Sequence, residues 1–161
     1  MKYFYPFIFL LAIVFAHPDI AAEKIYLPKV SWGENNAIDS VIKNVIQKCD
    51  SSGVYKDEIV LAEFLEKNDT LMCFFMPTEL KFLRSTKDMR GYNILDKRCL
   101  IFFIPREIQK RFKLSDRKKA FFINDPDAIC DTDGRRWYYE IIGNSYREMS
   151  VKEWIRQWGF W

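Results

Sequence analysis

Hydrophobic residues in the first part of the chain recur at helical spacing. Asn35 or Asn36 can cap a helix, and the polar stretch at 50–53 can end it. The apolar positions between them fall on one helix face: Ile38, Val41, Val45, Ile46 and Cys49. A second stretch, 57–67, has its apolar residues on one side of a helix: Leu61, Phe64 and Leu65. We therefore predict an N-terminal helical segment at 23–69 that contains two helices.

A different pattern begins at residue 70, where the apolar residues become continuous. The runs 71–76 and 99–104 are each followed by a proline, Pro77 and Pro105, and by a glutamate two residues later. Continuous apolar runs are typical of strands covered on both faces, and proline is tolerated in the first turn of a helix. We therefore predict strands at 71–76, 99–104 and 120–123, with helices at 79–88 and 107–114 between them.

The last part of the chain predicts one more strand and a closing helix. Asp133-Gly134 is a turn signal before an apolar strand at 137–142, which Gly143-Asn144 can end. Ser150 and Glu153 have the spacing of a capping box, followed by an apolar stripe of Val151, Trp154, Ile155 and Trp158. The resulting order, β-α-β-α-β-β-α over 70–161, looks like an α/β domain of the thioredoxin fold. The cysteine pair of an active thioredoxin is missing after the first strand, so such a scaffold would bind rather than oxidise.

Residues 1–22 have the layout of a secretory signal peptide. Lys2 precedes an uninterrupted apolar run at 7–16, and Ala21-Ala22 supplies small residues for cleavage before Glu23. An uncleaved anchor is the alternative, but the apolar stretch is shorter than the roughly 20 residues that span a bilayer. We expect an exported protein, periplasmic in a bacterium and secreted otherwise, with no membrane span after cleavage. The single histidine, His17, lies in this segment, so the mature chain lacks histidine-based catalysis.

Four cysteines fall in the mature part of the chain: Cys49, Cys73, Cys99 and Cys130. An even number of widely spaced cysteines in an exported chain predicts two disulfides, with four buried thiols as the alternative. Their pairing stays open. In the predicted sheet Cys99 and Cys130 lie at opposite ends of parallel strands, roughly 17–20 Å apart, so a bond between them is disfavoured.

The formal net charge of +3 is too small to indicate a nucleic-acid partner. The basic residues form short groups at 97–98, 110–113 and 117–119, without the interleaved aromatic residues of a stacking platform. We interpret these groups as solvated faces and predict no nucleic-acid binding.

An acidic cluster near residue 130 is the weak candidate for a metal site. Asp131, Asp133 and Glu140 have the spacing of calcium-loop positions, but Ile129 stands at the first position and Glu140 falls in a predicted strand. With Asp125 and Asp127, the cluster would otherwise hold Mg²⁺ or act as paired carboxylates. A polar turn is the preferred interpretation, and we predict neither a metal nor another cofactor.

The chain ends with large aromatic residues. Trp154 and Trp158 share a helix face and are expected in the core, whereas Phe160 and Trp161 follow the predicted helix and are candidate partner-binding residues.

Three segments carry a resemblance to a known family: 74–80, 103–105 with Phe112, and 141–144. They are similar to motifs of the TrbC family of pilin-assembly proteins of F-type conjugative transfer systems, which are exported and have a thioredoxin-like C-terminal domain. The chain departs from the family at Phe75, where the family has serine, and at Ile104, where it has aspartate. The resemblance implies pilus assembly in a conjugation or type IV secretion apparatus and brings no catalytic residues.

Together these features predict an exported, non-catalytic accessory or binding protein whose partners are other exported or envelope proteins. Two enzyme classes remain as alternatives: an atypical thiol–disulfide oxidoreductase or isomerase, and a secreted metal-dependent hydrolase that uses the aspartate cluster.

Overall fold

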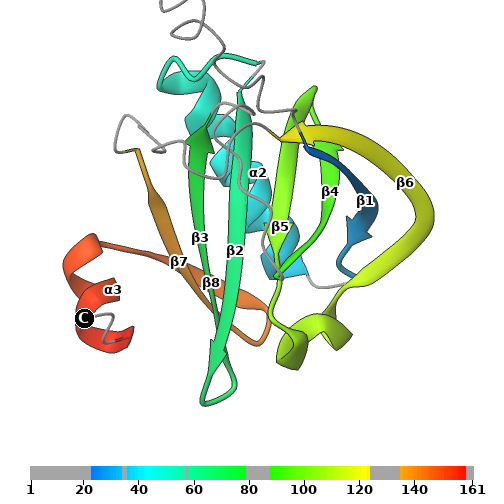
Figure 1. Ribbon diagram of the computed structural model, residues 1–161. Coiled ribbons are helices and arrows are strands. Elements are labelled where there is room, and N and C mark those ends of the chain that lie inside the picture. Colours follow the sequence, from blue (N-terminus) through cyan, green and yellow to red (C-terminus); the bar gives the residue numbers. More distant parts are fainter. Residues whose placement is uncertain (1–22, 34–35, 57, 79–87, 124–134, 159–161) are drawn as a thin grey trace, which may run out of the picture.

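The computed structural model describes residues 23–33, 36–56, 58–78, 88–123 and 135–158 (Figure 1). Most of these residues belong to one mixed sheet of eight strands. The elements are β1 (Glu23–Ser31), α2 (Asn36–Ser51), β2 (Ile59–Lys67), β3 (Thr70–Thr78), β4 (Met89–Leu95), β5 (Arg98–Phe103), the 3₁₀ helix η2 (Arg106–Arg111), β6 (Lys113–Ile123), β7 (Trp137–Ile142), β8 (Ser145–Met149) and α3 (Val151–Trp158).

The strands lie in the order β6-β1-β4-β5-β2-β3-β7-β8. The pairs β1–β4 and β2–β5 are parallel, and the other neighbours are antiparallel. In the described residues three hairpins have two-residue turns: β2–β3, β4–β5 and β7–β8. Asn68 and Asp69 join β2 to β3 with φ values of 51° and 60°, and Asp96 and Lys97 join β4 to β5 with 48° and 68°. Left-handed values at both turn positions match the twist of antiparallel strands.

The predicted thioredoxin-like layout is wrong. It made the strands at 71–76 and 99–104 parallel members of one sheet, linked through a helix. In the structure β2 lies between β3 and β5, antiparallel to the first and parallel to the second. The strands β3 and β5 therefore run in opposite directions. In the described residues, moreover, α2 is the one helix that precedes β2, whereas two N-terminal helices were predicted.

The second predicted helix, 57–67, is the strand β2. Its leucine, alanine and glutamate residues favour a helix by intrinsic propensity, but propensity is weak compared with tertiary packing. Val60, Ala62 and Phe64 are fully buried on one face of the strand, whereas Leu61 and Leu65 pack on the other. The turn at Asn68 then returns the chain alongside β2 as β3. Strands from both sides of residue 69 consequently share one sheet.

The helix α2 confirms the first predicted helix. Its apolar residues pack on one face of the sheet, where Figure 1 shows the helix crossing behind the strands. The buried set extends the predicted one by two positions: Ala37, Ile38, Val41, Ile42, Val45, Ile46 and Cys49. The helix ends in a turn in which Val54 N–H donates to the Cys49 carbonyl and Gly53 takes a φ of 74°. Glycine adopts this left-handed conformation without the strain of a Cβ atom.

The opposite face of the sheet carries two separate apolar clusters. One lies over β1, β4, β5 and β6 and contains Leu27, Met89, Ile101 and Phe121. The other lies at the β7–β8 end, where α3 packs on the sheet. Ser150 caps α3 as predicted, because its Oγ accepts from Glu153 N–H at 3.2 Å while the Glu153 carboxylate accepts from Ser150 N–H at 2.7 Å.

Other predictions have mixed outcomes. The strands at 71–76, 99–104 and 137–142 are confirmed as β3, β5 and β7. Pro77, predicted to open a helix, lies within β3, and most of the helix predicted at 79–88 lies outside the described residues. The helix predicted at 107–114 is the shorter η2, after which the chain enters β6 rather than a short strand at 120–123. The strands β1, β4 and β8 were not predicted.

Candidate functional site

A groove of 510 Å³ lies on the face of the sheet opposite α2, between β2, β3, β7 and α3. Its described lining is mostly apolar: Leu65 from β2, Phe74 and Met76 from β3, Tyr138 from β7, and Val151, Trp154 and Ile155 from α3. Two charged residues complete this lining, Glu63 in β2 and Arg136 just before β7. Pockets of this size and composition are typical of ligand-binding sites.

Aromatic packing holds one wall of the groove in place. Trp154 is buried, with its ring centroid 4.8 Å from that of Tyr138 and 6.2 Å from that of Phe74. Phe74 stacks on Tyr138 at 5.9 Å. These rings come from three elements, so α3 is fixed to the sheet by its own tryptophan. The expectation that Trp154 belongs to the core is confirmed, whereas the side chain of Trp158 is not among those described and its place in the core stays a prediction.

Glu63 interrupts an otherwise apolar row on this face. Along β2 its neighbours at alternate positions are Leu61, which packs in the cluster over β4 and β5, and Leu65, which packs in the cluster beneath α3. Across the sheet Glu63 is paired with Phe103 of β5 and Phe74 of β3. A half-buried carboxylate therefore stands between two phenylalanines and two leucines on the central part of the sheet.

The environment of Glu63 disfavours its charge. Burial among apolar groups raises its pKa above the ordinary value, and the nearby negative charge of Asp88 raises it further. In the described part of the chain no side chain hydrogen-bonds to Glu63 or forms an ion pair with it. Arg136 lines the same groove but does not pair with Glu63 either. A half-buried carboxylate without a partner among the described side chains is costly, because the water lost on partial burial is not replaced by any of these groups.

The groove offers apolar surface, one half-buried carboxylate and one guanidinium. A ligand that brings apolar groups and a positive charge would bury its apolar surface and give Glu63 a partner that the described side chains do not supply.

The sequence-predicted cysteines are not gathered at this groove. Cys49 and Cys73 are buried on the α2 face, and the half-buried Cys99 faces the other side of the sheet. All three are free thiols in the structure. Cys130 lies outside the described residues, so the absence of a Cys99–Cys130 bond stays a prediction.

The same burial makes the described thiols poor nucleophiles. Desolvation raises the pKa of Cys49 and of Cys99 to about 11, and it raises the pKa of the fully buried Cys73 further still. Thiolates, not thiols, attack disulfides and bind metals.

Glu140, a weak metal candidate, is engaged in another way. It is buried in β7, where its carboxylate accepts from Arg147 Nε at 2.5 Å and from Gln157 Nε2 at 2.6 Å. Its two companions, Asp131 and Asp133, lie outside the described residues, as do Asp125 and Asp127. Within the described ranges no group of three potential metal ligands occurs.

Three further predictions also fall outside the described residues: the signal peptide at 1–22 and the partner-binding candidates Phe160 and Trp161. Among the described helices none is long and apolar enough to cross a membrane.

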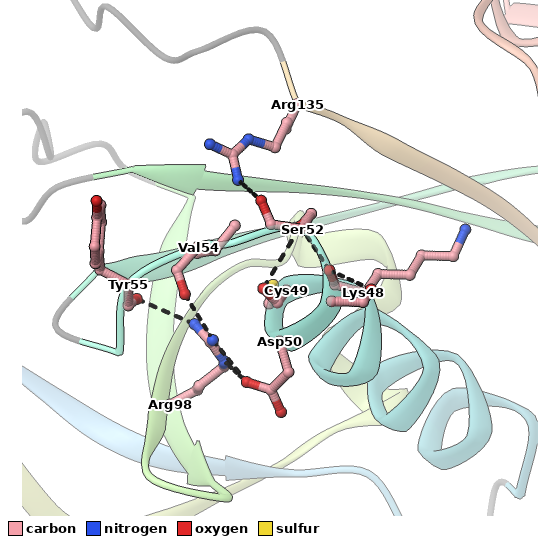
Figure 2. A network of polar contacts seen from close by, with 9 residues as sticks. Lys48, Cys49, Asp50, Ser52, Val54, Tyr55, Arg98 and Arg135 are labelled. Carbon is pink, nitrogen blue, oxygen red and sulfur yellow. Dashed lines mark hydrogen bonds and ion pairs between the residues drawn. The ribbon is translucent and has the colours of Figure 1, made fainter.

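Arg98 was interpreted as part of a solvated basic group, and this interpretation is wrong. Its side chain is 1% exposed and joins the start of β5 to the end of α2 (Figure 2). It donates to Asp50 Oδ1 from Nε at 3.1 Å and from Nη2 at 2.7 Å, and to the carbonyls of Val54 at 2.9 Å and Tyr55 at 3.1 Å. The network uses four of the donor positions that an arginine offers, so it stabilises this junction rather than forming a binding site.

Sequence reasoning missed Glu63 because a helix over 57–67 placed it on the solvated side. The signal was present in the alternation. Leu61, Glu63 and Leu65 occupy every second position, so in a strand the carboxylate shares its face with two leucines.

Comparison with known proteins gives no match, since no protein-family model, no curated protein and no solved structure matches this chain. The fold and the groove therefore define the class at a general level: an α+β domain with one helix packed on each face of a mixed sheet and an apolar, carboxylate-bearing groove. The resemblance to the TrbC family stays a prediction.

Proposed function

We propose that this chain is an exported, non-catalytic binding protein whose groove holds an apolar segment of another protein that carries one basic residue. The apolar side chains of the partner lie against Phe74, Met76, Tyr138 and Trp154. The ammonium or guanidinium group of the partner pairs with Glu63. The partners are other exported or envelope proteins, in agreement with the predicted signal peptide.

The observation that carries this proposal is the Glu63 carboxylate in the groove, which has no partner among the described side chains. Natural cores place charges in apolar surroundings rarely, and when they do the charge is paired or has a role in function. A leucine at position 63 would continue the row formed by Leu61 and Leu65 and would cost nothing in desolvation. The presence of a glutamate there is explained if a cation from a partner occupies the groove.

The two enzyme alternatives have less support. An oxidoreductase needs a thiol with a low pKa, whereas Cys49, Cys73 and Cys99 all have raised values. The aspartate cluster of a metal-dependent hydrolase lies outside the described residues, and the neighbouring metal candidate Glu140 is paired with Arg147 and Gln157. Membership of a conjugation apparatus remains part of the proposal through the motif resemblance alone.

A peptide titration tests the proposal. The probe is a blocked peptide of four leucines around one central lysine, flanked by serines. We expect binding to be saturable, with amide shifts in NMR spectra confined to β2, β3, β7 and α3. The same peptide with norleucine or glutamate at its centre is expected to bind at least about tenfold more weakly, because it leaves Glu63 unpaired or adds a like charge.

Two variants complete the experiment. Glu63→Gln removes the charge in the groove and is expected to abolish the preference for lysine. Asp116→Asn removes a carboxylate on β6, at the far edge of the sheet, and is expected to bind like the unmodified protein. Equal binding of all three peptides, or shifts outside the groove, would contradict the proposal.

A further inference from the structure

The strands β1 and β6 form the outer part of the sheet, away from the groove. Their antiparallel register places Lys24 opposite Phe122, Tyr26 opposite Ala120, and Pro28 opposite Lys118. Residues at alternate positions of paired strands share one face. Lys24, Tyr26, Lys118 and Phe122 therefore form one surface, here called the basic–aromatic surface.

These two strands concentrate the positive charge of the chain. They contain six cationic residues and two acidic ones, a formal net charge of +4 in a chain whose total is +3. The six cations are all exposed: Lys24, Lys29, Lys113, Arg117, Lys118 and Lys119. In the part of the chain that the structure describes, none of them forms an ion pair. Lys24 and Lys118 lie on the basic–aromatic surface, whereas Lys119 lies over Tyr92 and Phe121 on the opposite face of the sheet.

Exposed aromatic rings accompany this charge. Tyr26 and Phe122 are each 57% exposed, although both belong to strands with ordinary pairing. The ammonium group of Lys24 lies over both rings, with Nζ 5.3 Å from the centroid of Tyr26 and 5.6 Å from that of Phe122. The basic group at 117–119 contains no interleaved aromatic residue in the sequence, but pairing with β1 places Tyr26 and Lys24 on the same surface as Lys118.

Protection of the sheet edge explains part of this surface. Lysines on an edge strand prevent pairing with another chain, and β6 is an edge strand. Edge protection does not explain two large exposed rings beside these lysines, since exposed apolar groups on an edge promote association. The rings point to a partner with an apolar layer beneath an anionic layer.

We infer that the basic–aromatic surface binds an anionic phospholipid membrane. Lys24 and Lys118 contact the lipid phosphates, and Phe122 and Tyr26 insert at the level of the headgroups, where amphipathic aromatic side chains are favoured. Single-stranded nucleic acid fits less well, because Lys24 already covers faces of both rings on which bases would stack. The inference is independent of the peptide groove.

Vesicle flotation with the full chain tests this inference. The vesicles contain phosphatidylcholine alone or phosphatidylcholine with 30 mol% phosphatidylglycerol. Because the full chain is used with both, any contribution of residues 1–22 to vesicle binding is present in every measurement. We expect binding to rise with the anionic lipid and to fall as salt is added. Because one lysine near an anionic surface contributes about fivefold in affinity, the double variant Lys24→Gln/Lys118→Gln is expected to lose about 25-fold.

A matched variant controls for net charge. Lys110→Gln/Lys152→Gln removes two exposed lysines from η2 and α3 and is expected to retain the affinity for anionic vesicles. The variant Tyr26→Ser/Phe122→Ser, checked for folding by circular dichroism, is expected to lose the binding that persists at high salt. The inference is overturned if the two lysine pairs have equal effects, if anionic lipid does not increase binding, or if a 20-nucleotide single strand outcompetes the vesicles.

Discussion

Arg98 and Asp50 are separated by 48 residues in the sequence, yet Arg98 Nη2 lies 2.7 Å from Asp50 Oδ1. The guanidinium is buried, whereas the Asp50 side chain is 53% exposed. The two ends of this ion pair therefore contribute unequally. Arg98 also satisfies the carbonyls of Val54 and Tyr55, which would otherwise be left without partners beneath the end of α2.

Replacement of Arg98 is expected to destabilise the fold strongly. Arg98→Met removes every donor of the network and leaves two backbone acceptors unsatisfied, at a cost of about 2–4 kcal/mol in the free energy of unfolding. Asp50→Asn keeps an acceptor oxygen at an exposed position and is expected to cost less than about 1 kcal/mol. Urea unfolding of the two variants checks this, and similar losses for both would contradict the role assigned to Arg98.

Gly91 fixes the close approach of β1 to β4. A methyl group at this position would lie 2.5 Å from Val30 Cγ2 and would also overlap the Pro28 carbonyl oxygen. Gly91→Ala is therefore expected to cost about 1–3 kcal/mol, the usual cost of overpacking. Gly33→Ala is the matched control, since nothing lies within 4 Å of its added methyl group. A thermal shift that is equal for the two variants would show that β1 does not approach β4 as described.

The raised pKa of Glu63 makes stability depend on pH. Between the unfolded and folded pKa values the folded protein binds more protons, so its stability falls as pH rises through this range. Glu63→Gln has no such titration. The variant is therefore expected to be more stable than the unmodified protein at pH 8, with the difference vanishing below about pH 4. Urea midpoints of both proteins across this pH range measure the effect. The prediction is refuted if the stability of Glu63→Gln relative to the unmodified protein is lower at pH 8 than at pH 4.

The described thiols are expected to react slowly in the folded protein. Because burial raises the pKa of Cys49 and Cys99 to about 11 and that of Cys73 further, few thiolates exist at pH 8. Timed alkylation with iodoacetamide, followed by peptide mapping, should show protection of these three cysteines that is lost in urea. Rapid labelling of Cys73 without urea would contradict its burial. The same maps, made without reductant, test whether any cysteine is in a disulfide.

Local signals were sufficient for the elements with strong periodicity. The stripe from Ile38 to Cys49 predicted α2, and the reciprocal bonds of Ser150 and Glu153 confirm the cap of α3. The uninterrupted apolar runs predicted β3 and β5 because both strands are covered on two faces.

The rest of the fold depends on contacts that no local pattern encodes. The strand β6 begins with charged residues that read as a solvated segment, and its pairing with Lys24 and Tyr26 of β1 joins residues far apart in the chain. The strand β2 has helical propensity that pairing with β3 and β5 overrides. The groove was not predicted because β2 was predicted as a helix, and only a strand places Glu63 beside Phe74 and Phe103.

A double-mutant cycle tests the central claim, the pairing of Glu63 with a cation of the partner, most directly. Calorimetric titrations at pH 8 combine the unmodified protein and Glu63→Gln with the lysine and norleucine peptides. A coupling free energy of about 1 kcal/mol or more between Glu63 and the lysine is predicted, because the two opposite charges meet beside the apolar side chains of the groove. A coupling of zero, with all four affinities explained by additive changes, would contradict the account.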